Sequence, residues 1–217
     1  NWYVTEGDPR FHIVFFPFYP ICIRALNFLT GNSFVSAMLV SSLCAIAAAI
    51  LMYELAALDY ERETALRAVK FLFLTPAAFF FAAPMTESLF LLCSLACVYL
   101  VRKKHYLWGC LFGALAAFTR SVGVLLLAFV FVEWLYGLLR ARRMETLPTE
   151  KNTLIRQGLC MLLVPLGLAA YVAINYAVTG DPLKFMQYQR EHWSQGFGLF
   201  FETAAYQTEY ALSTAAE

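Results

Sequence analysis

Four short polar stretches, each set beside apolar runs, hold the side chains that could do chemistry. The first contains His12 and Tyr19, the second Glu87, the third Arg120, and the fourth runs from Asp181 to Trp193. Histidines and carboxylates can move protons, and a guanidinium can hold a phosphate through two parallel hydrogen bonds. This mixture of residue types suits a site that binds a sugar or a phosphate.

These four polar stretches alternate along the chain with loops whose polar residues are mainly Lys and Arg, which we call the basic loops. The Lys and Arg residues of the basic loops are Arg62, Arg67, Lys70, Arg102, Lys103, Lys104, Arg140, Arg142, Arg143, Lys151 and Arg156. Short loops rich in Lys and Arg favour the cytoplasmic side of a membrane. We therefore expect the basic loops in the cytoplasm and all four polar stretches on the non-cytoplasmic face.

The composition is that of an integral membrane protein. Hydrophobic residues make up 61% of the chain and charged residues 14%, against roughly 25% charged residues in soluble domains. The net charge is only +1, so no nucleic-acid partner is expected. Five of the six cysteines lie inside apolar runs and Cys22 stands alone, which predicts buried apolar residues rather than disulfides. No residue cluster calls for a metal or another cofactor.

The lengths of the apolar runs divide them into two classes. Ser33–Tyr53 and Gly158–Val178 have 21 residues each, about 31 Å of helix, enough for a hydrocarbon core of roughly 30 Å. Phe71–Ala83, Leu89–Val101 and Tyr106–Phe118 have 13 residues each, about 20 Å of helix, which is too short to cross. Such short paired helices predict a recessed pocket on the non-cytoplasmic face.

Further segments complete the predicted organisation. Val122–Leu139 is a further helix, and the basic stretch Arg140–Arg156 with Pro148 is expected to be a linker. In Phe11–Leu29, Pro17 and Pro20 should break regular helix, so we expect a re-entrant or interfacial segment. Thr30 to Ser33 should form a turn and a helix start.

The sequence thus predicts an all-α polytopic transmembrane helical bundle that forms a single membrane domain. Its expected parts are a non-cytoplasmic loop and interfacial segment over 1–32, about six transmembrane or hairpin helices over 33–179, and a non-cytoplasmic amphipathic segment over 180–217.

Each candidate site residue has a structural alternative. His12 and Tyr19 could contact a sugar or a lipid phosphate, or belong to an interfacial aromatic anchor. Glu87 could take part in a substrate site, or serve with Thr86 to cap a helix start. Arg120 could bind an anion, or reach toward head groups or pair with Glu87.

The segment Asp181–Trp193 reads as an amphipathic helix that lies over the pocket, with Asp181 as its cap and a proline at its first position. Helical spacing aligns Phe185 with Gln189 and with His192 or Trp193, and Lys184 with Tyr188 and Glu191. The residues of this helix that could contact a ligand are Lys184, Gln189, Arg190 and His192.

Four motifs in order resemble the GPI mannosyltransferase II (PIG-V) family and its bacterial relatives. They are His12-Ile-Val-Phe-Phe-Pro-Phe-Tyr-Pro; Thr75-Pro-Ala-Ala-Phe-Phe-Phe with Met85-Thr-Glu-Ser-Leu-Phe; Thr119-Arg-Ser-Val-Gly; and Gly180-Asp-Pro with Gln189-Arg-Glu-His-Trp. The resemblance implies a membrane glycosyltransferase of the GT-C type. It also implies transfer of a sugar, typically mannose, from a polyprenyl- or dolichyl-phosphate donor to a glycolipid or other membrane-bound acceptor. The host membrane would be the bacterial plasma membrane or the endoplasmic reticulum.

The chain departs from the family pattern at its start. The resemblance implies an acidic catalytic base in the first non-cytoplasmic loop, commonly in a Trp-Asp motif. Asn1-Trp2-Tyr3 resembles the residues that follow that motif, so we expect the chain to be a fragment with its main base upstream of Asn1. Glu6 and Asp8 remain as catalytic candidates. The hypothesis is an inverting transfer in which Arg120 stabilises the departing lipid phosphate, with Lys184 or Arg190 as substitutes.

Two other classes of function stay open. A lipid or solute transporter would also place polar turns within the membrane, although the chain has no matching halves. A catalytically silent membrane subunit would fit a chain that lacks the expected acid.

The topology gives the first testable prediction. Cysteines introduced by Glu87→Cys and Lys103→Cys, with the native cysteines replaced, should react with an impermeant maleimide from opposite sides of an intact bilayer, because basic loops stay cytoplasmic. Lys151→Cys is the control and should react from the same side as position 103. Labelling of positions 87 and 103 from one side would contradict the topology.

Overall fold

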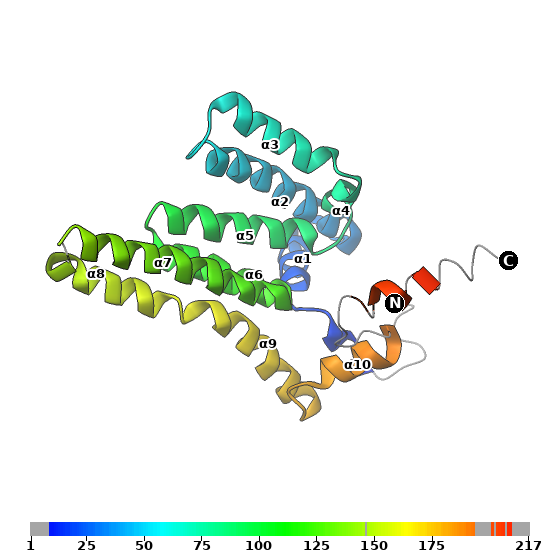
Figure 1. The fold of residues 1–217 in the computed structure, drawn as a ribbon. Helices are drawn as coiled ribbons and strands as arrows, with labels where there is room; N and C mark the ends of the chain where they lie inside the picture. The colour runs from blue at the N-terminus through cyan, green and yellow to red at the C-terminus, as the bar shows by residue number, and fades with distance from the viewer. Residues whose placement is uncertain (1–8, 146, 194–200, 202, 207, 210–217) are drawn as a thin grey trace. The chain divides into compact units, whose positions relative to one another are not determined.

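The chain is built of helices. The computed structural model describes residues 9–145 and 147–193, together with 201, 203–206 and 208–209, and no β-strand occurs in this part of the chain. The longer helices are α1 (Phe18–Thr30), α2 (Ser33–Ala56), α3 (Arg62–Leu74), α5 (Glu87–Arg102), α6 (Tyr106–Thr119), α7 (Leu126–Arg143), α8 (Leu147–Cys160), α9 (Leu163–Thr179) and α10 (Lys184–Trp193) (Figure 1). The short ones are η2 (Pro9–Val14), η3 (Pro76–Ala78), α4 (Phe79–Ala82) and η4 (Ser121–Leu125).

The protein is an all-α membrane helical bundle, as the composition predicts. Within the described residues, three helical stretches are long and apolar enough to cross a membrane: Ser33–Ala56, Ser121–Arg143 and Thr149–Thr179. A fourth results if the bent pair Arg62–Leu74 and Pro76–Ala82 counts as one span. At 14 residues, α6 is about 21 Å long, shorter than a hydrocarbon core of roughly 30 Å.

The described residues fall into two compact units. The larger is Phe15–Ile174, and the smaller combines the described parts of Asn1–Val14 and Asn175–Glu217. In the smaller unit η2 packs against α10, whose buried side chains are Phe185 and Tyr188. The single membrane domain expected from the sequence stays a prediction.

Helix α5 is central in the larger unit, where it packs against α2, α6 and α7. Near its start, the Ser41 hydroxyl of α2 donates to the Met85 carbonyl at 3.3 Å. At its last residue, the Arg102 guanidinium donates to both carboxylate oxygens of Asp59, which follows α2, at 2.5 and 2.8 Å. Since Ser41 of α2 contacts the start of α5, and Asp59 just after α2 contacts the end of α5, the two helices run in the same direction. Helix α6 returns beside α5 in the opposite direction (Figure 1).

Small residues bring α5 and α6 close together. A Cβ at Gly109 would lie 2.6 Å from Val101 Cγ2, and one at Gly113 would lie 3.2 Å from Cys97 Sγ. Ala116 and Cys97 are fully buried in the same region. Helices in membranes pack through such small residues because lipid gives them no hydrophobic drive to associate.

The sequence prediction for Phe71–Ala83 is wrong, because no single helix covers these residues. Helix α3 ends at Leu74, Thr75 is extended at φ −65° and ψ 146°, and the chain resumes in η3 and α4. The two parts are bent by 74°. Pro76 explains the break, since it has no N–H and disfavours helical backbone in the residue before it.

Two further expectations about proline are also wrong. The predicted linker Arg140–Arg156 is largely helical, because α7 runs to Arg143 and α8 begins at Leu147, so the last apolar stretch does not start at Gly158. Pro20 does not break α1 either. Both Pro20 and Pro148 lie in a first helical turn, where the missing N–H has no partner to lose. The predicted turn at Thr30–Ser33 is confirmed, with Gly31 left-handed at φ 65° and the Asn32 side chain capping α2.

One close helix crossing yields a stability prediction. A Cβ at Gly167 of α9 would clash with the backbone carbonyl of Ala114 in α6, and backbone cannot move aside as a side chain can. Gly167→Ala should therefore lower the free energy of unfolding by about 1–3 kcal/mol, the usual cost of overpacking. Thermal unfolding in detergent measures it.

Gly137→Ala is the matched control. Its Cβ would meet only Leu154 Cδ2, at 3.9 Å, so the midpoint of unfolding should not fall. Equal unfolding midpoints for Gly167→Ala and Gly137→Ala would contradict the close approach of α9 to α6.

Candidate functional site

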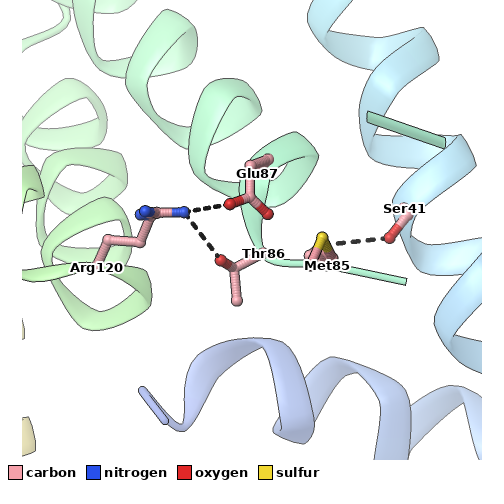
Figure 2. A network of polar contacts seen from close by, with 5 residues as sticks. All are labelled: Ser41, Met85, Thr86, Glu87 and Arg120. Carbon is pink, nitrogen blue, oxygen red and sulfur yellow. Dashed lines mark hydrogen bonds and ion pairs between the residues drawn. The ribbon is translucent and has the colours of Figure 1, made fainter. Parts of the chain in front are cut away.

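Three polar residues meet where α5 begins and α6 ends. Arg120 lies between α6 and η4, Glu87 is the first residue of α5, and Thr86 precedes it. Arg120 Nη1 donates to Glu87 Oε1 at 2.5 Å and to Thr86 Oγ1 at 3.4 Å. Figure 2 shows the guanidinium reaching toward both side chains. Sequence reasoning had offered this pairing as one alternative for Arg120, and it is present.

The fold explains why residues so distant in sequence come together. Helices α5 and α6 are antiparallel neighbours, so the first turn of one adjoins the last turn of the other. The Arg120 backbone is extended at φ −152° and ψ 141°, between the α-helix and η4. Behind it, Gly123 lies against the backbone of Ala116 and Ala117, and a Cβ there would clash with them. This contact fixes the chain path from which Arg120 projects.

The pair is half-buried and keeps unused hydrogen-bonding capacity. The Glu87 side chain is 30% exposed and that of Arg120 is 42% exposed. Within the described residues Glu87 Oε2 is buried and has no hydrogen-bond partner, and only Nη1 of Arg120 is engaged. A guanidinium has five N–H donors. The arrangement can therefore accept a hydroxyl at Glu87 and hold an anion at the remaining donors of Arg120.

Helix capping does not explain these residues. The side chain of Thr86, at the N-cap of α5, makes no capping hydrogen bond, so the predicted capping role is wrong for Thr86. Glu87 still gains from the positive end of the helix dipole, as acidic residues in a first turn do. Its side chain pairs with Arg120.

A second layer of hydroxyl groups supports this end of α5. Tyr19, 5% exposed, hydrogen-bonds to the Ser41 hydroxyl at 2.7 Å, and its hydroxyl oxygen lies 3.1 Å from the Ala37 carbonyl oxygen. Ser41 in turn donates to the Met85 carbonyl, just before Thr86 (Figure 2). The Tyr19 hydroxyl thus helps to position the turn that carries Glu87. Ser41 was missed from the sequence; its signal is a serine within an otherwise apolar helix.

The other predicted site residues belong to the smaller unit or lie outside the description. His12 lies on η2, and Lys184, Gln189 and Arg190 lie on α10. The side chain of His192, and all of Glu6 and Asp8, fall outside the described residues. The predicted common hollow of His12, Glu87, Arg120 and His192 therefore stays a prediction.

Helix α10 differs in detail from its predicted form. It begins at Lys184, two residues after Pro182, although Asp181 Oδ1 does accept from the Leu183 N–H at 2.9 Å. Phe185 and Tyr188 are both buried, so they share one face rather than lying on two.

The side chain of Lys184 is engaged within α10. Its ammonium donates to Gln187 at 2.7 Å and lies 5.1 Å from the centre of the Tyr188 ring.

The opposite end of the larger unit carries basic residues in ion pairs. Arg102 binds Asp59 there, and Lys104 Nζ lies 3.7 Å from Glu133. The hydrogen bonds from Arg102 lower the pKa of the Asp59 carboxyl below its usual value. Since α5 separates Glu87 from Arg102, the candidate site and the basic residues occupy different ends of the bundle. Among the described residues no group of three His, Cys, Asp or Glu side chains could hold a metal.

Comparison with known proteins identifies the family. The family model described as Mannosyltransferase (PIG-V) matches residues 14–178, a range that begins in η2, ends in α9 and includes both Glu87 and Arg120. No curated protein and no solved structure matches the chain. The matched range covers most of the sequence, and the chain therefore belongs to the PIG-V mannosyltransferase family of integral membrane glycosyltransferases.

Proposed function

We propose that this chain transfers mannose from a polyprenyl- or dolichyl-phosphate donor to a hydroxyl group of a glycolipid or other membrane-bound acceptor. The family supports mannose transfer. The observation that carries the rest is the Arg120 guanidinium, which is held in place through Nη1 alone and is 42% exposed. A fixed, partly open guanidinium beside a short apolar helix suits the phosphate of a lipid-linked sugar.

The reaction is an inverting displacement at the sugar's anomeric carbon. The acceptor oxygen forms the new bond on one face, while the bond to the lipid-phosphate oxygen breaks on the other. The acceptor proton passes to a carboxylate that acts as general base. Negative charge grows on the departing phosphate, and Arg120 stabilises it there because its hydrogen bonds are preorganised.

Glu87 serves this reaction as a positioning residue. Its Oε1 fixes the guanidinium, and its buried Oε2, unpartnered among the described residues, is free to accept a hydroxyl of the sugar. Because Glu87 is engaged with Arg120, this role is proposed for it in place of that of the base. The general base is therefore assigned elsewhere, with Glu6 and Asp8 as the candidates within this sequence.

The remaining contacts are proposed for the flanking segments. His12 on η2, with Lys184, Gln189, Arg190 and His192 on α10, would contact the donor or the acceptor. Tyr19 would act through Ser41 and Met85, since its own hydroxyl is already engaged. The reaction would take place on the non-cytoplasmic face, because the basic residues gather at the other end of the bundle.

A transporter is the second candidate, favoured by one observation. The 74° bend between α3 and α4 resembles the broken helices that line transport sites. In this chain Pro76 accounts for the bend locally. Formation of mannose-labelled acceptor distinguishes the two functions, because a transporter would move lipid or solute without forming a glycosidic bond.

The proposal predicts a large loss of turnover for Arg120→Ala. Removing a donor that stabilises developing charge costs about 10²- to 10³-fold in kcat. Arg120→Lys should recover only part of it, since an ammonium cannot make two parallel bonds to a phosphate. The assay measures the transfer of labelled mannose from mannosyl lipid phosphate to the acceptor by the protein in proteoliposomes.

Arg102→Ala is the matched control. It removes an arginine that also pairs with a carboxylate at an end of α5, yet lies at the basic end, so transfer should stay near the wild-type rate. Undiminished transfer by a folded Arg120→Ala protein would exclude Arg120 from the phosphate site. Absence of transfer by the wild-type protein would favour the silent subunit.

A further inference from the structure

A cavity opens at the basic end of the larger unit, far along α6 from Arg120. Its volume is about 250 Å³, and it lies between the α5–α6 turn and helix α8. The charged and polar side chains that line it include Lys104, His105, Arg156 and Gln157. The mechanism proposed above uses none of them.

The lining has the charge expected of an anion site. Lys104 and Arg156 bring two cations, and no carboxylate is among the lining residues. Lys104 also faces Glu133 at 3.7 Å, but its side chain is 56% exposed. Within the described residues Arg156 has no hydrogen-bond or ion-pair partner. Its five N–H donors are thus available to a phosphate group.

The backbone adds donors to the same space. His105, at the N-cap of α6, makes no side-chain capping bond. The first N–H groups of a helix have no partner within it, so those of Leu107 and Trp108, which line the cavity, can reach an anion. Lys104 is left-handed at φ 67° in the tight turn that brings these groups beside α8.

An apolar flank accompanies the cationic lining. Leu107 and Trp108 are each 57% exposed. Indole rings favour the interface between membrane and water, and basic pockets between helices at that depth attract anionic lipid head groups. A phosphate beside Arg156, with an acyl chain along Leu107 and Trp108, would satisfy both parts of the cavity.

We propose that this cavity binds the phosphate of an anionic phospholipid, at a site separate from that of sugar transfer. The recognised chemistry is a phosphate anion, and the apolar flank favours a lipid as its source. Arg156 and Lys104 neutralise the head group, while the α6 N-terminus fixes its position. The inference stands independently of the proposed function, since binding requires no turnover.

Lipid-dependent thermal stability of the purified chain in mild detergent tests this site. Dioctanoyl phosphatidylglycerol should raise Tm saturably, whereas the phosphatidylcholine of equal chain length should not. Arg156→Gln should raise the half-saturating concentration about tenfold, the effect of losing roughly one charged contact to phosphate. Lys104→Gln should weaken binding in the same direction.

Lys103→Gln is the matched control, since Lys103 neighbours the turn without lining the cavity, and it should titrate like the wild type. An equal rise in Tm with inorganic phosphate at the same concentrations would overturn the lipid as the source. Equal titrations of the wild type and both cavity variants would overturn the site itself.

Discussion

The cost of an ionised group inside a membrane is the constraint on which this structure depends. A lone Arg, Lys or Asp at a helix centre costs about 2.5–3.5 kcal/mol on insertion scales. Here Glu87 and Arg120 stand at the ends of neighbouring apolar helices, one of them only 14 residues long, and they pair with each other. The pairing lowers the cost for both while it leaves donors and an acceptor unused. Two charges therefore lie between apolar helices without either one being isolated.

The rest of the larger unit holds that pair in place. Small residues let α5 and α6 approach closely, and Ser41 and Asp59 attach α5 to α2 near both of its ends. Tyr19 extends the support to α1 through a buried hydroxyl. The position of Arg120 beside Glu87 thus depends on the packing of α5 against α6 and on the hydroxyl groups of Tyr19 and Ser41.

Sequence patterns predicted what depends on local chemistry. The lengths of α2, α5 and α6 followed from their apolar runs, and the turn at Gly31–Asn32 followed from residues suited to left-handed backbone and capping. The roles of the prolines were harder to predict, because Pro76 follows the end of α3 whereas Pro148 lies within the first turn of α8. Position within the helix decides between these outcomes, and a pattern search does not fix that position.

The site was predicted in part. Glu87 and Arg120 were recognised because charges between apolar runs are expensive, and their mutual contact was one of two alternatives. Choosing between the alternatives required the direction and spacing of α5 and α6, which come from packing over the whole unit. Ser41 was not predicted, because a serine in an apolar helix donates to a carbonyl of its own helix as often as it bonds to a neighbouring segment.

The bend at Pro76 has a mechanical consequence for the end of the bundle that carries Glu87. Helix α3 buries only Ala65, and η3 and α4 bury no residue, so the residues of this wall of the larger unit are otherwise half-buried or exposed. A bilayer whose thickness does not match a hydrophobic segment makes that segment tilt or kink. Pro76 is the weakest point along this wall, and the chain passes from α4 to Thr86 within four residues. Mismatch with the surrounding lipid would flex this hinge, while α5, anchored to α2, would hold Glu87 still.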